Sequence, residues 1–312
     1  MATHVPVLLE EVMEVLDVRP DRNYIDATVG GGGYTREILK RSGPSGRVLG
    51  IEWDEATLGK LNFGIHGASD LSPSGDGSRE GSSALSRPLS QRLVLTQGNF
   101  AEIGDIARSH NFTTVHGVVF DLGLSSILLE ESGRGFSFQS DEPLLMTFEK
   151  GSAYSAAKLV NGSTAEEIEE IFTKYGEIRN ARLLAQKIVE ARRVRPIMRT
   201  GELTAVIDGV IGRKSVSFYA KVFQALRIKE NRELQNLERG LSGTWEVLGP
   251  GGRIAVVSFH SLEDRIVKNF FREKAKSGEG KILTKKPTVP GEEEVRGNRR
   301  ARSAKLRALQ KS

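Results

Sequence analysis

The sequence predicts an α/β protein of Rossmann type whose sheet is interrupted by a helical region. A glycine-rich turn, Gly30 to Gly33, lies between a strand-like and a helix-like segment, and a second strand-like segment about twenty residues later ends in Glu52. Alternating strands and helices are typical of a parallel sheet. The stretch from about 128 to 215 has no convincing strand pattern, which predicts an inserted all-helical domain.

The segment from Asp26 to Thr35 contains the four consecutive glycines. Glycine permits positive φ and lets the backbone approach a ligand closely. In Rossmann-type folds an acid at the end of the second strand accepts hydrogen bonds from ribose hydroxyls, which makes Glu52 the expected ribose ligand. The G-x-G-x-x-G spacing is missing, which favours a nucleoside such as S-adenosylmethionine over a dinucleotide. The alternative is a loop that is merely flexible, and the spaced acid argues against it.

Composition excludes several classes of protein. The chain has 312 residues, enough for one large domain or two smaller ones, and 38% of them are hydrophobic. No stretch approaches the roughly 20 apolar residues of a membrane span. There is no cysteine, so the chain can form neither a disulfide nor a thiolate metal site. The five histidines are scattered without the spacing of metal ligands, so no metal site is expected. The first residues have no signal pattern, so the expected location is the cytoplasm.

The formal net charge is +5, and its distribution suggests a nucleic-acid partner. Basic clusters stand at 192–195, at 285–286 and at 296–302, and the last holds four arginines. Such clusters supply phosphate contacts. The alternative for each cluster is a solvated basic surface.

The pattern of elements continues along the whole chain. Strand-like segments are expected at 23–29, 47–53, 92–96, 116–122 and 254–259, and helices at 164–175, 180–193, 201–207 and 222–241. Residues 248–253 are expected to form a turn, and 281–286 with 303–309 a terminal antiparallel pair. Residues 67–90, rich in Ser, Gly and Pro, are expected to be a disordered surface insertion. The predicted domains are 1–127 with 216–312, and 128–215.

Nine sequence blocks, in one fixed order, cover nearly the whole chain outside 67–90. They are 4–9, 26–35, 121–126, 134–138, 175–177, 223–228, 250–253, 258–265 and 302–307. In this order they resemble the RsmH (MraW) family of methyltransferases, which methylate N4 of a cytidine in small-subunit ribosomal RNA with S-adenosylmethionine. The resemblance implies a class I methyltransferase sheet with an inserted helical substrate-recognition domain. The implied partner is small-subunit ribosomal RNA or the small subunit itself, and a homodimer is a further expectation.

The resemblance also implies roles for individual residues. Expected cofactor contacts are Gly32, Gly33, Tyr34, Glu52, Phe100, Asp121 and Leu128. Expected catalytic residues are Asp121, Ser125, Ser126 and His260, and expected RNA contacts are Arg134 and Arg227. Simpler roles stay open: Asp121 as a capped strand end, His260 as a structural hydrogen bonder and Arg227 as a salt-bridge partner. The target base must be single-stranded or extruded, since pairing engages N4 in a duplex.

The chain departs from the family pattern at several positions. Tyr34 replaces a usual His and Glu52 a usual Asp, while Ile127-Leu128 replace Pro-Gln and remove a polar group near the cofactor. Leu145 and Thr147 replace an acid and an arginine. The departures erode the substrate half more than the cofactor half. A methyltransferase with another RNA target, and a non-catalytic RNA-binding homologue, are therefore the alternatives.

Overall fold

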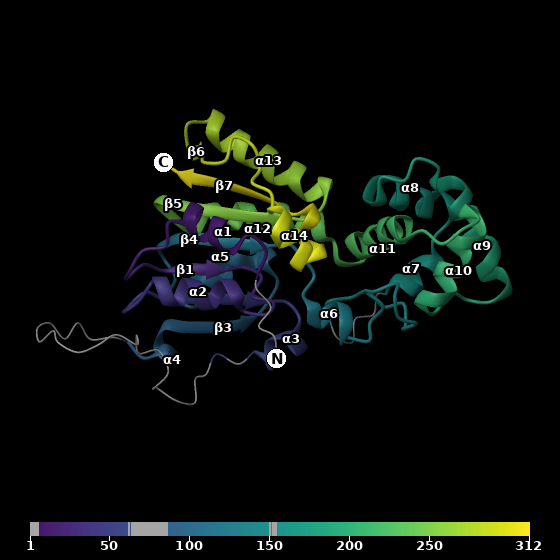
Figure 1. Ribbon diagram of the computed structural model, residues 1–312, viewed down its shortest axis with the longest axis horizontal. Helices are drawn as coiled ribbons and strands as arrows, with labels where there is room; N and C mark the ends of the chain where they lie inside the picture. The colour runs from purple at the N-terminus through teal and green to yellow at the C-terminus, as the bar shows by residue number, and fades with distance from the viewer. Residues whose placement is uncertain (1–5, 62, 64–86, 150, 152–154) are drawn as a thin grey trace, which may run out of the picture. The chain divides into compact units, whose positions relative to one another are not determined.

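The computed structural model describes residues 6–61, 63, 87–149, 151 and 155–312. His4 and Val5 of the first block lie outside these residues, as does the segment 67–90 up to residue 86. Contacts divide the chain into two compact units, Met1–Gly123 with Asn236–Ser312, and Leu124–Gln235. We call them the sheet unit and the helical unit (Figure 1). Among the described residues, none of the helices has the length and hydropathy needed to cross a bilayer.

The sheet unit is built on seven strands in the order β3-β2-β1-β4-β5-β7-β6. The first five strands of the chain pair in parallel, and β7 joins β5 and β6 antiparallel. This arrangement confirms the predicted α/β fold and the terminal antiparallel pair. The strands are β1 (Tyr24–Asp26), β2 (Val48–Glu52), β3 (Leu93–Gln97), β4 (Val115–Asp121), β5 (Leu248–Ser258), β6 (Gly280–Ile282) and β7 (Lys305–Lys311).

Helices cover the sheet through two apolar clusters. One cluster joins the sheet to α5, α12 and α13, with Leu241 and Phe271 among its buried members, and the other joins it to α1 and α2 through residues such as Met13 and Ile38. The short strands are buried because both sheet faces are covered. The helices of this unit are α1 (Leu9–Leu16), α2 (Gly33–Arg41), α3 (Glu55–Lys60), α4 (Leu89–Arg92), α5 (Ile103–Ser109), most of α12 (Glu233–Val247), α13 (Ser261–Lys276) and α14 (Glu292–Gly297).

The helical unit contains no strand among its described residues, as the sequence predicts. Thr164 begins α8 with a capping box: the Thr164 hydroxyl accepts the Glu167 N–H, and the Glu167 carboxylate accepts the Thr164 N–H. Helix α8 packs against both α9 and α11. The helices are α6 (Ser126–Glu130), α7 (Ala156–Gly162), α8 (Ala165–Gly176), α9 (Ala181–Val194), α10 (Thr200–Ile211) and α11 (Val216–Asn231).

The single long helix expected at 222–241 is wrong. The chain forms α11 and α12 instead, and Arg232 between them has φ 51°, a left-handed conformation that ends a helix. Because α11 packs on α7 and α8, it belongs to the helical unit. The boundary between the units therefore follows residue 235, whereas the sequence placed it before 216.

The turn expected at 248–253 is also incorporated into a larger element. Leu248 pairs with Val115 and Arg253 with Gly117, so β5 has extra residues that bulge away from β4. Gly251 has φ 74°, which suits this irregular stretch. The predicted strand 254–259 is thus the regular end of a longer β5, which delivers Ser258 to the carboxyl edge of the sheet.

Candidate active site

The glycine turn and the acid at the end of β2 are bonded to each other. The Gly30 N–H donates to Glu52 Oε2 at 2.9 Å, and the Asp54 N–H donates to Glu52 Oε1 at 2.9 Å. Glu52 is only 8% exposed. The carboxyl ends of β1 and β2 are neighbours in a parallel pair, which brings these two motifs together. The carboxylate is held in place and retains lone pairs for a further donor.

The turn requires glycine at defined positions. Gly30 and Gly32 have φ 51° and 76°, where a side chain is strained. A Cβ on Gly33 would stand 2.1 Å from Pro6 Cγ, and one on Gly32 would stand 2.7 Å from Phe63 Cζ. The glycine run in the sequence accounts for the positive φ values of Gly30 and Gly32. The close approach of Pro6 and Phe63 is visible only in the structure.

Two acids that end neighbouring strands are joined through Thr28. Asp26, fully buried, accepts the Thr28 N–H at 3.2 Å and the Thr35 hydroxyl at 2.6 Å. The Thr28 hydroxyl accepts the Asp121 N–H at 2.6 Å, and Asp121 Oδ1 accepts the Gly123 N–H at 3.3 Å. Sequence reasoning singled out Asp121 but assigned no role to Asp26 or Thr28. Their place in the block Asp26 to Thr35 was the signal available.

Burial sets the protonation of these acids. Desolvation raises the pKa of Asp26 to about 6 and those of Glu52 and Asp121 to about 7, with backbone hydrogen bonds opposing the shifts. Within the described part of the chain, no Lys or Arg forms an ion pair with any of the three. Acids beside a glycine turn that have no cationic partner among the described residues suit a ligand that carries positive charge.

Phe100 and Tyr34 occupy different surroundings. Phe100 follows β3 in a short 3₁₀ turn (Phe100–Glu102), is partly buried, and meets Phe120 edge to face with centroids 5.7 Å apart. Tyr34 is 2% exposed, and its hydroxyl donates to the Val7 carbonyl. The Tyr34 side chain therefore belongs to the core, and its backbone N–H at the start of α2 is the part left for a ligand.

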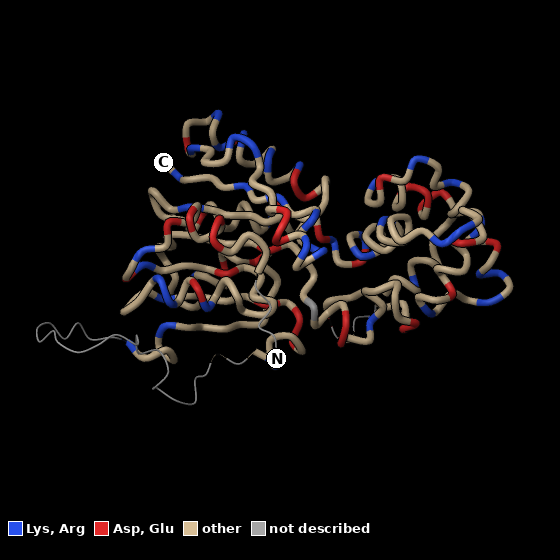
Figure 2. The backbone as a smooth tube through the Cα atoms, in the orientation of Figure 1, with Lys and Arg blue, Asp and Glu red and all other residues tan. Residues whose placement is uncertain are grey.

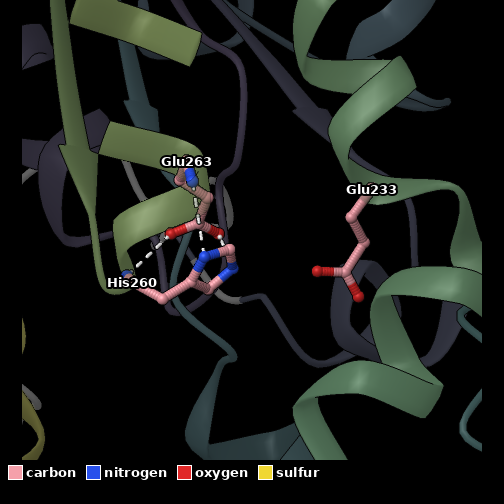
Figure 3. A group of neighbouring side chains, drawn as sticks. All are labelled: Glu233, His260 and Glu263. Atoms are coloured by element: carbon pink, nitrogen blue, oxygen red, sulfur yellow. Dashed lines mark hydrogen bonds and ion pairs between the residues drawn. The ribbon is translucent and has the colours of Figure 1, made fainter. Parts of the chain in front are cut away.

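His260 caps α13. Its Nδ1 accepts the Glu263 N–H at 3.3 Å, and Glu263 Oε2 accepts the His260 N–H at 3.2 Å (Figure 3). The same Glu263 oxygen accepts the Phe259 N–H at 2.8 Å. His260 Nε2 lies 3.1 Å from Glu263 Oε1. These contacts support the structural role that the sequence left open for His260, and they fix the imidazole at the carboxyl end of β5.

The remaining predicted residues lie in the helical unit. Ser125 caps α6 by accepting the Leu128 N–H at 3.2 Å, and Leu128 is 5% exposed. The side chain of Ser126 lies outside the described part. The catalytic roles of Ser125 and Ser126 and the cofactor contact of Leu128 remain predictions.

Both arginines predicted to contact RNA already have partners. The Arg134 guanidinium donates to the carbonyls of Thr147 and Phe148, both at 3.1 Å. Arg227 makes a bidentate pair with Glu233 at 2.8 and 2.9 Å, and both side chains are about 15% exposed. The open alternative for Arg227, a salt bridge, is what the structure contains. Each arginine holds the helical unit together, whatever else it contacts.

A sheet whose first five strands are parallel, with a glycine turn after β1 and a buried acid at the end of β2, is typical of class I methyltransferases. Comparison with known proteins narrows this class. A family model described as the MraW methylase family matches residues 1–63 and 79–312, and the chain belongs to this family. It is an enzyme that uses S-adenosylmethionine. The unmatched residues 64–78 overlap the predicted insertion 67–90.

Individual relatives match over almost the whole chain. Ribosomal RNA small subunit methyltransferase H of Heliobacterium modesticaldum is 42% identical over 328 residues, covering 99% of this chain and 98% of the relative. The protein of the same name from Symbiobacterium thermophilum is 43% identical, covering 99% and 96%. A solved structure of a putative rRNA methylase from Clostridium thermocellum aligns with a TM-score of 0.45 and 13% identity, covering 99% of this chain and 100% of that one.

Proposed function

We propose that this protein transfers a methyl group from S-adenosylmethionine to N4 of a cytidine in small-subunit ribosomal RNA. The observation that carries the proposal is the hydrogen bond between the glycine turn and Glu52, at the carboxyl ends of the strands where Asp121 also lies. Among the described residues, no Lys or Arg forms an ion pair with either acid. The names of relatives more than 40% identical point to small-subunit ribosomal RNA as the substrate. A ribosomal substrate agrees with a cytoplasmic location.

The site offers a distinct group to each part of the cofactor. The free lone pairs of Glu52 would accept the ribose hydroxyls, because its other lone pairs are already engaged by Gly30 and Asp54. The exposed part of the Phe100 ring would pack on adenine. Backbone N–H groups at Gly33 and Tyr34 would face the methionine end. The Gly32 N–H already donates to the Val29 carbonyl at 2.7 Å, so Gly32 would contribute by leaving the backbone accessible.

Asp121 is placed to assist the transfer itself. The cofactor supplies an electrophilic methyl group on a sulfonium. The cytosine N4 is a poor nucleophile because its lone pair is delocalised, so most of the rate must come from orientation and from stabilising charge that develops on nitrogen. As the N–CH₃ bond forms and the S–CH₃ bond breaks, N4 becomes positive and loses a proton. A carboxylate whose pKa is raised to about 7 can accept that proton and pass it to water.

Exposed cations that could contact the RNA backbone lie on α13. Lys268, Arg272 and Lys276 are four residues apart, so they share one helix face, and all three are exposed. None of the three has an ion-pair partner among the described residues. Figure 2 shows Lys and Arg recurring along α13. The helix starts beside His260, so this face leads away from the candidate site and could guide a phosphate backbone to it.

The test is methylation of purified small subunits by the parent protein and by Asp121→Asn. The parent should form N4-methylcytidine, and the variant should lose at least about tenfold in kcat while keeping the fold. Formation of a different methylated nucleotide would favour a methyltransferase with another RNA target. That alternative is considered because Leu145 and Thr147 replace an acid and an arginine of the family pattern. Cofactor binding without any transfer would indicate a non-catalytic homologue. Light scattering tests the expected homodimer.

A further inference from the structure

A short N-terminal segment, Pro6 to Leu8, lies on the glycine turn. The Pro6 ring occupies the space where a Cβ on Gly33 would be, 2.1 Å from Pro6 Cγ. The Tyr34 hydroxyl donates to the Val7 carbonyl, and Tyr34 is 2% exposed. The segment therefore touches the first turn of α2 at two consecutive residues. We call Pro6 to Leu8 the strap.

The far end of the strap is fixed by a residue from the other end of the chain. The Leu8 N–H donates to Glu294 Oε1 at 2.8 Å, although 286 positions separate the two residues. Leu8 is 1% exposed and has φ 56°, a conformation that β- and γ-branched residues rarely adopt. A buried N–H without an acceptor is unfavourable, so Glu294 stabilises a backbone turn that would otherwise be strained and unsatisfied.

From these contacts we infer that Glu294 is a positioning residue for the cofactor. Its carboxylate anchors the strap, and the strap holds the first turn of α2 and the glycine turn in the shape that receives S-adenosylmethionine. The inference rests on the proposed cofactor site at Gly32, Gly33 and Tyr34. Glu294 itself is outside that site and acts through Leu8. The alternative is a purely structural role, in which Glu294 only accepts the Leu8 N–H at the start of α1. That role predicts lower stability with unchanged cofactor affinity.

The experiment compares three variants of the full chain. Glu294→Ala removes the acceptor. Glu294→Gln keeps an oxygen that can accept the same N–H, and Glu293→Ala makes an equal charge change at an exposed neighbour in α14. Calorimetry gives the Kd for S-adenosylmethionine, initial rates on small subunits give KM for cofactor and kcat, and thermal unfolding gives Tm. We expect Glu294→Ala to raise Kd and cofactor KM by about three- to tenfold, with kcat within about twofold of the parent.

Glu294→Gln and Glu293→Ala should both stay near the parental Kd. Tyr34→Phe removes the second tie to the strap, so it should raise Kd in the same direction, and combining it with Glu294→Ala should give less than the product of the two effects. A lower Tm for Glu294→Ala with unchanged Kd would overturn the inference, as would a Gln variant as impaired as the Ala variant. If Glu294→Ala does not fold, the Tyr34→Phe result decides. The Kd comparison remains valid even if the parent methylates no RNA, so failure of the two proposals is distinguishable.

Discussion

The substitution Glu52→Gln separates two effects of this acid: the destabilisation of the fold by its buried charge and the binding of the cofactor. In the empty protein, desolvation by burial raises the pKa of Glu52 from its ordinary 4.5 to about 7. The difference corresponds to roughly 3 kcal/mol of unfavourable ionisation. Since Glu52 is 8% exposed, solvent screens little of this term. The substitution removes the charge at nearly constant volume and leaves one oxygen to accept the Gly30 or the Asp54 N–H.

The sign of the pH dependence follows from where the pKa is raised. The folded protein holds the Glu52 proton up to about pH 7, whereas the unfolded chain releases it near pH 4.5, so parental stability falls as pH rises through this window. Glutamine has no such titration. The free energy of unfolding of Glu52→Gln minus that of the parent should therefore increase by up to about 3 kcal/mol across the window and then level off. The lost hydrogen bond lowers the difference by about 1 kcal/mol at every pH.

Urea unfolding of the empty protein at several pH values measures this difference, and calorimetry measures cofactor affinity in parallel. Cofactor binding should weaken by about 1–3 kcal/mol in Glu52→Gln even where the empty protein is more stable. Glu55→Gln, at an exposed acid of α3, is the matched control and should show neither effect. A stability difference that is flat or that falls with pH would refute the electrostatic reasoning. Unchanged cofactor affinity would remove Glu52 from the site.

Three further predictions concern other parts of the site and chain. Thr28→Val removes the acceptor of the Asp121 N–H, so stability should fall by about 1–2 kcal/mol and kcat by about tenfold, with recovery in Thr28→Ser; wild-type kcat in the valine variant would argue against the role of this bond. Leu145→Asp with Thr147→Arg should raise methylation of small subunits if the substrate half of the chain is eroded at these positions. Because Thr147 is only 8% exposed, Tm is measured as well; full activity of the parent without a gain in the double variant would contradict this interpretation. Replacing residues 64–78, which the family model leaves unmatched, by a short linker should leave Tm and turnover nearly unchanged, because loop-closure entropy varies slowly with length; a large loss of either would refute it.

The segment that can be replaced ends earlier than the insertion predicted from the sequence. The predicted insertion extends to residue 90, but α4 begins at Leu89, and Arg92 at its end donates to the Gly46 carbonyl at 2.8 Å while also contacting the Leu39 carbonyl. Composition reveals where periodicity is lost, yet it does not reveal which backbone carbonyls a buried arginine reaches. Deletions that approach Leu89 should therefore lower stability.

The local part of the site is predictable from the sequence because its signals are short-range. Four glycines after a strand and an acid at the end of the next strand indicate the candidate site by residue type and spacing alone. The bond from Gly30 to Glu52 follows directly once the two strands pair in parallel. The same reasoning locates Asp121, since strands that alternate with helices place their carboxyl ends at one edge.

The long-range part is not predictable from a single sequence. The tie between Thr28 and Asp121 depends on the pairing of β1 with β4, which are 93 residues apart at this contact. The strap depends on Glu294, near the other end of the chain. Nothing in the local sequence around either residue specifies its partner.

Helix α11 ends where local propensity favours continuation. Apart from Asn231, the residues around Arg232 are good helix formers, and a continuous helix is therefore expected from sequence. In the structure the Asn231 side chain donates to the Met146 carbonyl at 2.7 Å and accepts the Phe148 N–H at 2.9 Å, and the pair between Arg227 and Glu233 spans the break. These tertiary contacts outweigh a propensity difference of well under 1 kcal/mol per residue.

The most direct test of the account is a nucleotide-resolution map of N4-methylcytidine in small-subunit ribosomal RNA. The map compares subunits incubated with S-adenosylmethionine and the parent protein, the Asp121→Asn variant, or no protein. The account predicts one cytidine that is methylated at N4 by the parent and much less by the variant. No N4-methylcytidine with the parent, or equal methylation by Asp121→Asn, would contradict it.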